Sequence, residues 1–359
     1  MPRVLFNPFL LLREDLRQLQ PYQPHDYPGT IKLDANENPY PLPEIIQQEA
    51  QASLKNSKFN RYPDPTATEL RRGIARYAGV GVGQIMVGNG SDELILNLIQ
   101  AFGSGGKVII TDPTFGMYRI HSCIAGAEAV TVSRREDFSI DAQQVITVAG
   151  QCNAKLVMLC SPNNPTGNAT PLTVIEEILG NVQGIVVVDQ AYIEFGGDDC
   201  VALLSKYPNL VILRTFSKAF GLAGLRLGYL LAHPGVVKEL KRVKQPYNVN
   251  VFSQATGVAA LNHLDAFKKQ WQQIITDRDK LAIELAKLQG LQVLPSVANF
   301  ILVRYPAGAE KLHQKLLSMR ILVRYMGQSM PEYLRIGVGT TAENQQLLQA
   351  LQTITREVN

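Results

Sequence analysis

Short apolar runs alternate with longer stretches of helical periodicity through the middle of the chain. The runs are apolar on nearly every residue, which indicates strands that are buried on both faces. Seven runs are predicted strands: 84–87, 107–111, 129–132, 155–160, 184–188, 210–213 and 228–232. Helix-like stretches separate them, for example at 92–102, 115–125 and 171–179. This alternation predicts an α/β fold with a mostly parallel sheet between two layers of helices.

A different pattern occupies the last third of the chain. A long helical stretch at 254–289 is followed by strand candidates at 299–304, 322–325 and 333–338, which alternate with helices. These features predict a smaller α+β domain. Because a chain of 359 residues is long for one core, we expect a large domain at 44–255 and a small one at 256–359.

The first 43 residues differ from both regions. They contain six prolines between positions 21 and 43, which is typical of an extended arm. The apolar start is interrupted by Asn7 and Pro8 and lacks a small-residue cleavage site, so a signal peptide is not favoured. We predict a short amphipathic helix at 9–19, followed by an arm that packs partly on the small domain.

Composition and charge exclude several functions. The net charge of +4 is small, and like charges never form a run of five, so neither a nucleic-acid groove nor a polybasic membrane patch is supported. No apolar stretch is long enough to span a bilayer. The four cysteines form no Cys-x-x-Cys pair and the five histidines have no zinc spacing. We expect reduced cysteines, no metal site and a cytoplasmic protein.

Candidate chemistry lies where the predicted strands end, since ligands of open α/β sheets bind beyond the carboxyl ends of the strands. The sequence Gly88-Asn89-Gly90 follows the first strand and precedes Ser91 and Asp92. Backbone N–H groups at such a helix start can bind a phosphate, although a simple helix cap is an equally good interpretation. The segment does not fit the Gly-x-Gly-x-x-Gly dinucleotide motif.

Two further strand ends carry weaker signals. Phe115 follows the strand at 107–111 and could stack on a flat ring, although a phenylalanine there is more often core. Asn164 lies in the loop 161–167, where two prolines and a glycine fix the backbone. This loop could hold the amide of Asn164 toward a cleft, or it could be a plain turn.

The strand at 184–188 leads directly into Asp189, with Tyr192 three residues later. A carboxylate at the end of a buried strand is costly unless it is paired. A protonated pyridine nitrogen would be such a partner, and it would keep pyridoxal phosphate an effective electron sink. A helix cap and a structural salt bridge are the alternatives.

Lys218 follows the strand at 210–213 and is flanked by Phe216 and Phe220. Most lysines are solvated, but these apolar flanks are not typical of a solvated surface. A lysine amine with a lowered pKa can form an imine. Ser217 and Arg226 add a hydroxyl and a guanidinium suited to a phosphate.

Together these motifs resemble the class I and II aminotransferases of fold type I, which use pyridoxal 5'-phosphate. The resemblance rests on Ser217-Lys218 with Arg226 eight residues on, on the Asn-Pro-Thr-Gly sequence at 164–167, and on Asp189-x-x-Tyr192. It extends from Leu33-Asp34-Ala35-Asn36 to Val338-Gly339-Thr340 and so covers nearly the whole chain. It implies a large domain with a mostly parallel sheet between helices and a smaller α+β domain.

The resemblance also implies how the cofactor is held. Lys218 would form the Schiff base with pyridoxal phosphate and shuttle a proton between the substrate α-carbon and the cofactor. Asp189 would pair with the ring nitrogen, Asn164 and Tyr192 would hydrogen-bond the phenolate oxygen, and Phe115 would stack on the ring. Four residues would surround the phosphate: Ser91, Asp92, Ser217 and Arg226.

Substrates and partners follow from the same resemblance. Within the family it is strongest to members that transaminate L-histidinol phosphate, a phosphorylated amino alcohol, with 2-oxoglutarate to give glutamate. Arg335 would bind the substrate carboxylate, Arg324 is a candidate for the substrate phosphate, and Tyr22 and Asn36 would line the pocket. Tyr62 would reach the cofactor phosphate of a neighbouring subunit, which implies a homodimer with shared active sites.

Three alternatives stay open on this scaffold: an aromatic amino-acid aminotransferase, a threonine-phosphate decarboxylase and a non-enzymatic regulator. The regulator is disfavoured because no basic DNA-binding helix is visible. Two residues depart from the family pattern. Phe115 stands where many relatives have tyrosine, and Gln190 stands where they often have glutamate. We expect little effect from Gln190, because a side chain adjacent to Asp189 should point away from the cofactor.

Overall fold

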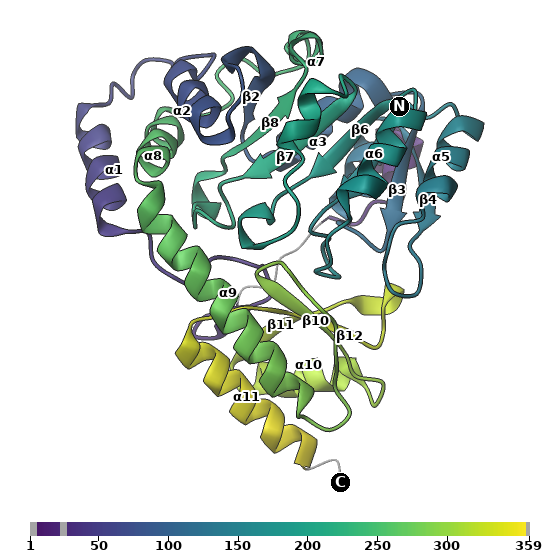
Figure 1. Cartoon of the computed structure of the whole chain (residues 1–359), viewed down its shortest axis with the longest axis vertical. Helices are drawn as coiled ribbons and strands as arrows, with labels where there is room; N and C mark the ends of the chain where they lie inside the picture. Colours follow the sequence, from purple (N-terminus) through teal and green to yellow (C-terminus); the bar gives the residue numbers. More distant parts are fainter. Residues whose placement is uncertain (1–5, 22–26, 357–359) are drawn as a thin grey trace, which may run out of the picture.

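The computed structural model describes residues 6–21 and 27–356 and contains two sheets (Figure 1). The larger sheet has seven strands in the order β2-β8-β7-β6-β5-β3-β4. Its strands are β2 (Ile85–Gly88), β3 (Lys107–Asp112), β4 (Glu128–Ser133), β5 (Leu156–Cys160), β6 (Ile185–Asp189), β7 (Leu210–Thr215) and β8 (Gly228–Ala232). Strand β8 runs antiparallel to both neighbours, and the other pairs are parallel. The mostly parallel α/β sheet predicted from the sequence is confirmed, and no strand end differs from its prediction by more than two residues.

Helices cover both faces of this sheet, which is why its strands are apolar on successive residues. On one face Val157 and Val186 pack with helices α2 (Thr68–Ala78), α5 (Ala142–Gln151), α6 (Leu172–Asn181) and α8 (Val251–Asn262). On the other face Met158 and Val187 pack with α3 (Ser91–Leu98), α4 (Met117–Ile124) and α7 (Pro234–Leu240). Helix α1 (Glu44–Asn56) packs against α8, and α3 continues into the π-helical turn η4 (Ile99–Gly103).

The second sheet has five strands in the order β1-β11-β12-β10-β9. They are β1 (Ile31–Leu33), β9 (Gln292–Val293), β10 (Phe300–Arg304), β11 (Ile321–Tyr325) and β12 (Tyr333–Gly337). Helices α9 (Leu264–Ala286), α10 (Ala309–Ser318) and α11 (Thr341–Arg356) pack with it, and α9 runs along the molecule from the larger sheet to the smaller one (Figure 1). Because β1 pairs with β11, residues 31–33 of the N-terminal arm form an edge strand of this second sheet.

One sequence prediction about helices was confirmed and one was wrong. The long helical stretch predicted at 254–289 is helical, and it consists of α8 and α9, which are separated at His263, whose backbone lies at φ −121° and ψ 41°. The prediction of a helix at 9–19 was wrong: two 3-10 turns, η1 (Pro8–Leu11) and η2 (Glu14–Gln18), take its place, separated by Arg13 and an extended Leu12. None of their residues is buried, and a short helix without a packing partner is marginal in water.

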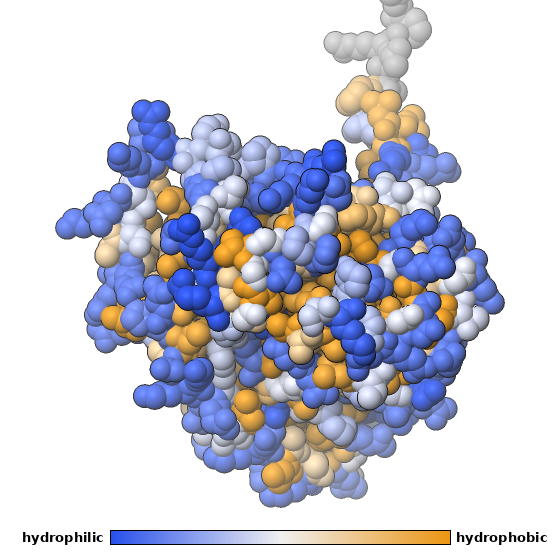
Figure 2. All heavy atoms as spheres, turned by 45° about the horizontal axis from the view of Figure 1, so that its top comes forward, coloured by the Kyte–Doolittle hydropathy of each residue, from blue (hydrophilic) through white to orange (hydrophobic). Residues whose placement is uncertain are grey.

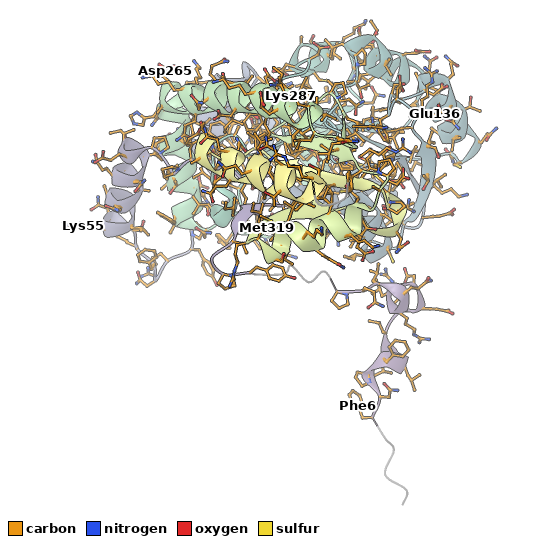
Figure 3. All side chains as sticks on the ribbon, turned by 90° about the horizontal axis from the view of Figure 1, so that it is seen from below. Phe6, Lys55, Glu136, Asp265, Lys287 and Met319 are labelled. Carbon is orange, nitrogen blue, oxygen red and sulfur yellow. The ribbon has the colours of Figure 1, made fainter. Side chains whose placement is uncertain are left out.

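This N-terminal segment stands off from the rest of the protein. Figure 3 shows Phe6 at its far end, and Figure 2 shows its apolar side chains gathered away from the body. Phe6 and Leu11 are more than three-quarters exposed, at 78% and 76%. The segment is anchored where Arg13 Nη2 donates to the carbonyl oxygens of Cys123 and Ile124 at the end of α4.

The remaining 3-10 turns are short: η3 (Val82–Gln84), η5 (Ile193–Phe195), η6 (Val201–Ser205), η7 (Ala223–Leu225) and η8 (Gly327–Ser329). Within residues 6–21 and 27–356, none of the helices combines the length and apolar character needed to cross a membrane. The domain boundaries themselves stay a prediction.

Candidate active site

Polar side chains lie at the carboxyl ends of three neighbouring strands of the larger sheet, β5, β6 and β7. Cys160, the last residue of β5, lies opposite Asp189 in β6, and Asp189 in turn lies opposite Leu213 in β7. The loop that holds Asn164 follows β5, and Lys218 follows β7 by three residues. The structure therefore brings Asn164, Asp189 and Lys218 to the same carboxyl edge of the sheet.

Lys218 lies in a partly buried turn. Its Nζ donates to the carbonyl oxygen of Ala35 at 2.8 Å and lies 6.0 Å from the ring centre of Tyr192. Burial and the charge of Arg335 lower the pKa of the Lys218 amine to about 8, although Glu37 and Asp92 oppose the shift. A substantial share of this amine is therefore neutral at mildly alkaline pH, as a nucleophile or base requires.

Asp189 is 3% exposed and accepts two hydrogen bonds. The Tyr118 hydroxyl donates to Oδ2 at 2.7 Å, and the backbone N–H of Ala191 donates to Oδ1 at 3.1 Å. Burial nevertheless raises the pKa of Asp189 to about 6, because these bonds offset the desolvation only in part. A cation placed against this carboxylate would relieve the remaining penalty.

Sequence reasoning missed Tyr118, whose side chain is fully buried in α4. A tyrosine inside a predicted helix is ordinarily core, and nothing local indicates that its hydroxyl meets Asp189. One signal was available: Tyr118 follows Phe115 by three residues, a spacing that places both on the same side of a helix. Their rings meet edge to face with centres 5.5 Å apart.

The second sheet contributes Arg335 from β12. Its Nη1 donates to Asn164 Oδ1 at 2.5 Å, and its Nη2 donates to the carbonyl oxygen of Asp34. Asn36 is buried, and its Nδ2 donates to the Tyr192 hydroxyl at 3.2 Å. These contacts bring Asn36, Asn164, Tyr192 and Arg335 together, and they join the second sheet to the edge of the first.

Arg324 and Arg335 lie directly opposite each other on antiparallel strands β11 and β12. Side chains of such a pair share one face of the sheet, and like charges placed this way repel each other. The guanidinium of Arg335 is held 5.5 Å from the ring centre of Phe300, while Arg324 is exposed. An anion bound between the two arginines would remove their repulsion.

The predicted phosphate residues converge at the start of α3. Arg226 Nη2 contacts Asp92 Oδ2 at 3.0 Å, and Arg226 Nη1 donates to Ser217 Oγ at 3.5 Å. Gly90, with φ at +83°, precedes Ser91, and a Cβ added there would lie 2.7 Å from Arg226 Nη2. The glycine thus keeps open the space beside Ser91, Ser217 and Arg226, a cradle that a side chain would fill.

These groups fit pyridoxal phosphate. The cradle combines a guanidinium, hydroxyl groups and backbone N–H groups at a helix start, which suits a phosphate dianion. The buried Asp189 carboxylate calls for a cationic partner such as a protonated ring nitrogen, and the Lys218 amine is the group that condenses with an aldehyde. Phe115 is half-buried beside Tyr118, at the same edge of the sheet.

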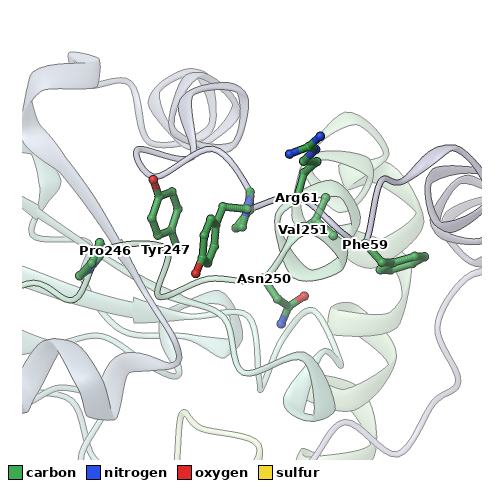
Figure 4. Close-up of a pocket in the computed structure, with 8 residues that line it drawn as sticks. Phe59, Arg61, Pro246, Tyr247, Asn250 and Val251 are labelled. Carbon is green, nitrogen blue, oxygen red and sulfur yellow. The ribbon is translucent and has the colours of Figure 1, made fainter.

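Two predicted residues are not part of this cluster. Tyr62 is 81% exposed and stacks on Tyr247, with ring centres 4.4 Å apart. The two tyrosines line a surface pocket together with Phe59, Arg61 and Asn250 (Figure 4). Tyr22 lies outside the described residues. Among the residues that the structure describes, no group of three or more potential ligands could hold a metal ion.

Comparisons with known proteins agree with this geometry. The sequence model "Aminotransferase class I and II" matches residues 28–351. Histidinol-phosphate aminotransferase 1 of Carboxydothermus hydrogenoformans is 47% identical over 340 residues, which cover 94% of this chain and 97% of the relative. The histidinol-phosphate aminotransferase of Thermococcus gammatolerans is 40% identical over 344 residues, with coverage of 96% and 97%.

A solved structure is similar over the same length. The histidinol-phosphate aminotransferase of Sinorhizobium meliloti, determined in complex with pyridoxal-5'-phosphate, superposes with a TM-score of 0.85 at 26% identity and covers 92% of each chain. The family match spans both sheets and every residue of the cluster described above. The chain therefore belongs to the class I and II aminotransferase family.

Proposed function

We propose that this chain is a pyridoxal-phosphate-dependent transaminase. It would convert L-histidinol phosphate and 2-oxoglutarate to imidazole acetol phosphate and L-glutamate, as a step of histidine biosynthesis. The observation that carries the proposal is the meeting of Lys218 and Asp189 at one sheet edge, where the lysine pKa is lowered and the aspartate pKa is raised. Relatives between 37% and 47% identical over most of the chain support the choice of substrate.

The cofactor supplies an electron sink that acidifies the α-carbon of an amine attached to it. Lys218 Nζ would be the base that takes the proton from this carbon and later releases it. Because its pKa is about 8, the amine can both accept and release a proton near neutral pH. Asp189 would keep the ring nitrogen of the cofactor protonated, and Tyr118 orients the carboxylate through its 2.7 Å hydrogen bond.

Two contacts fix which atoms of Asn164 and Tyr192 can donate. Arg335 occupies Asn164 Oδ1, which leaves the amide N–H group of Asn164 for the phenolate oxygen of the cofactor. Asn36 donates to the Tyr192 oxygen, so the hydroxyl hydrogen of Tyr192 can be directed at that same phenolate. Phe115 would bound one face of the ring, and Ser91, Asp92, Ser217 and Arg226 would surround the phosphate.

Arg324 and Arg335 are proposed to select the substrate. L-histidinol phosphate presents a phosphate ester where an amino acid presents its carboxylate. A phosphate dianion can engage both opposed arginines, whereas a carboxylate needs only one. We assign Arg335 to both substrates and Arg324 to the phosphate, with Asn36 and Tyr22 lining the pocket.

Steady-state kinetics test this assignment. Wild-type protein should prefer L-histidinol phosphate to phenylalanine and tyrosine as amino donor, and should release no carbon dioxide from threonine phosphate. In Arg324→Ala, kcat/KM for histidinol phosphate should fall about 10²-fold, the loss expected for a charge-assisted hydrogen bond, while kcat/KM for 2-oxoglutarate stays within a few-fold. Arg335→Ala should lower both values.

The control is Arg324→Lys, which keeps the charge and should lose less than the alanine variant. Equal losses for both substrates in Arg324→Ala would contradict the assignment of Arg324. A stronger activity with an aromatic amino acid, or release of carbon dioxide, would replace the proposed substrate while leaving the cofactor chemistry in place.

We further propose a homodimer in which Tyr62 of each chain reaches the cofactor phosphate of the other. Its 81% exposure and its position on an open pocket support a role outside its own chain. Lys218→Ala and Tyr62→Phe subunits should each be weakly active or inactive alone. Co-expressed, they should regain activity, because one site of the mixed dimer has both residues.

Each variant expressed alone is the control for that mixture. Light scattering should give twice the chain mass of 39.6 kDa for wild-type protein. A mixed population that stays as inactive as its components, although mixed dimers form, would show that Tyr62 does not act across the interface.

A further inference from the structure

A buried arginine lies directly behind the candidate active site. Arg214 is in β7, four residues before Lys218, and its side chain is 4% exposed. Successive residues of a strand face opposite sides, so Arg214 lies on the opposite face of the sheet from Leu213. Since Leu213 is the cross-strand partner of Asp189, Arg214 is on the far side of the sheet from the Asp189 carboxylate.

Arg214 joins three parts of the chain. Its Nη2 donates to Gln190 Oε1 at 3.0 Å and to Asp199 Oδ1 at 2.5 Å. Gln190 is fully buried, its backbone N–H donates to the carbonyl oxygen of Leu213, and its Nε2 donates to the carbonyl oxygen of Asp198 at 2.9 Å. The guanidinium thus clamps both ends of the segment 190–199 to the strand that leads to Lys218.

That segment holds a residue of the candidate site. Tyr192 lies between the two clamped ends, and Asp189 immediately precedes them. Glu194 lies in the same segment, and the charge of Arg214 opposes the rise that burial causes in its pKa. The hydrogen bond that its carboxylate accepts comes from the Tyr77 hydroxyl, at 3.2 Å. Asp199, although its side chain is 53% exposed, is the carboxylate that contacts the guanidinium directly.

We propose that the Arg214–Asp199 ion pair, together with Gln190, positions Tyr192 and Asp189 relative to Lys218, so that Asp199 is a positioning residue for the reaction. The inference rests on the proposed cofactor chemistry, but it does not depend on which amine is the substrate. Among the described residues, Asp199 contacts Arg214, not Lys218, Tyr192 or Asp189. It would therefore act only through the segment 190–199. Small displacements of groups that must meet a reacting centre have large effects on rate.

The experiment compares Asp199→Asn with Asp198→Asn. Both remove one exposed carboxylate from the same loop, but only Asp199 contacts Arg214. In Asp199→Asn, kcat should fall about 10-fold with a smaller change in KM, and the pH midpoint of the visible absorbance of the bound cofactor should shift, because Tyr192 and Asp189 move against it. Asp198→Asn should match wild-type protein in all three measurements.

A second substitution supplies the rescue. Gln190 Oε1 already lies 3.0 Å from Arg214 Nη2, so Gln190→Glu places a carboxylate at the guanidinium from inside the clamp, and it exchanges the hydrogen bond from Nε2 to the carbonyl oxygen of Asp198 for this charge. Added to Asp199→Asn, it should return kcat to within about 3-fold of wild-type and restore the pH midpoint, since the lost charge partner is replaced. If Asp199→Asn alone does not fold, the double variant can still be measured, and a pH midpoint equal to that of wild-type protein would show that the clamp is restored.

Three outcomes would overturn the inference. The first is a lower melting temperature of Asp199→Asn with unchanged kcat and unchanged pH midpoint, which would make the ion pair purely structural. The second is an equal effect of Asp198→Asn. The third is a double variant that is stable but keeps the defects of Asp199→Asn. Failure of the proposed substrate is distinguishable, because the absorbance titration requires only protein and pyridoxal phosphate.

Discussion

Replacing Lys218 by alanine is expected to abolish transamination while the protein still folds and still takes up pyridoxal phosphate. Lys218 is the one amine that the structure places beside both Tyr192 and the Arg335 guanidinium within the described residues. Loss of a proton-transfer group typically lowers a rate by about 10² to 10⁴-fold, and loss of the covalent attachment adds to that effect. We expect a fall in kcat of about 10⁴-fold or more.

Two measurements distinguish loss of chemistry from loss of binding. Borohydride reduction should fix the cofactor to the wild-type chain at Lys218 and leave Lys218→Ala unlabelled. The cradle of Ser91, Ser217 and Arg226 is intact in the variant, so the cofactor should still bind without a covalent bond. The matched control is Lys268→Ala, which removes a lysine from the exposed face of α9, where it pairs with Asp265 at 3.1 Å.

The pH dependence gives a further check on Lys218. Its pKa is lowered to about 8, below that of an unfolded lysine, so between these two values the unfolded chain binds more protons than the folded one. Stability of the protein freed of cofactor should therefore rise with pH through this window, and Lys218→Ala should lack that rise. Covalent uptake of pyridoxal phosphate by wild-type protein should accelerate as pH approaches 8. A Lys218→Ala protein that still catalyses transamination would end the proposal.

The sequence could predict the part of the site that depends on strand ends. Carboxyl ends of neighbouring parallel strands share one edge, so apolar runs followed by Asn164, Asp189 and Lys218 indicate groups that meet. The same reasoning predicted the larger sheet almost to the residue. Each of these inferences needs only local periodicity and one topological rule.

Contacts that depend on packing between distant elements could not be predicted in this way. Nothing near Tyr118 indicates that its hydroxyl meets a carboxylate 71 positions away. The clamp formed by Arg214 joins two strand ends and a loop, and the opposition of Arg324 and Arg335 depends on the register of two antiparallel strands. The prediction of an N-terminal helix was wrong for a different reason: the amphipathic pattern is present in the sequence, but among the described residues η1 and η2 bury none of their side chains.

Asp189→Asn should lower activity and raise stability at the same time. Asparagine keeps the shape of the side chain. Its Oδ1 can still accept from the backbone N–H of Ala191, and its Nδ2 can donate to the Tyr118 hydroxyl oxygen, so the substitution removes mainly the charge. Without that charge the ring nitrogen loses the partner that keeps it protonated. Groups that stabilise developing charge are worth about 10² to 10³-fold in kcat, and we expect a loss in that range.

The effect on stability follows from the pKa of Asp189, which is raised from 3.8 to about 6. Between these values the folded chain binds more protons than the unfolded one, so the stability of wild-type protein freed of cofactor falls as pH rises through this window. Above pH 6 the full penalty applies, and a shift of about two units corresponds to roughly 3 kcal/mol. Asp189→Asn does not carry this penalty.

Urea unfolding of both proteins without cofactor, from pH 3.5 to 8, measures the difference directly. The variant should be more stable than wild-type protein by about 2–3 kcal/mol at pH 7, and the difference should shrink toward zero near pH 4. Saturation with pyridoxal phosphate should reverse the order, because the ring cation then pairs with the wild-type carboxylate and has no such partner in the variant. Equal stabilities at pH 7 would show that burial does not destabilise the Asp189 carboxylate. A variant that retains full kcat would show that this carboxylate is not needed as a partner of the cofactor.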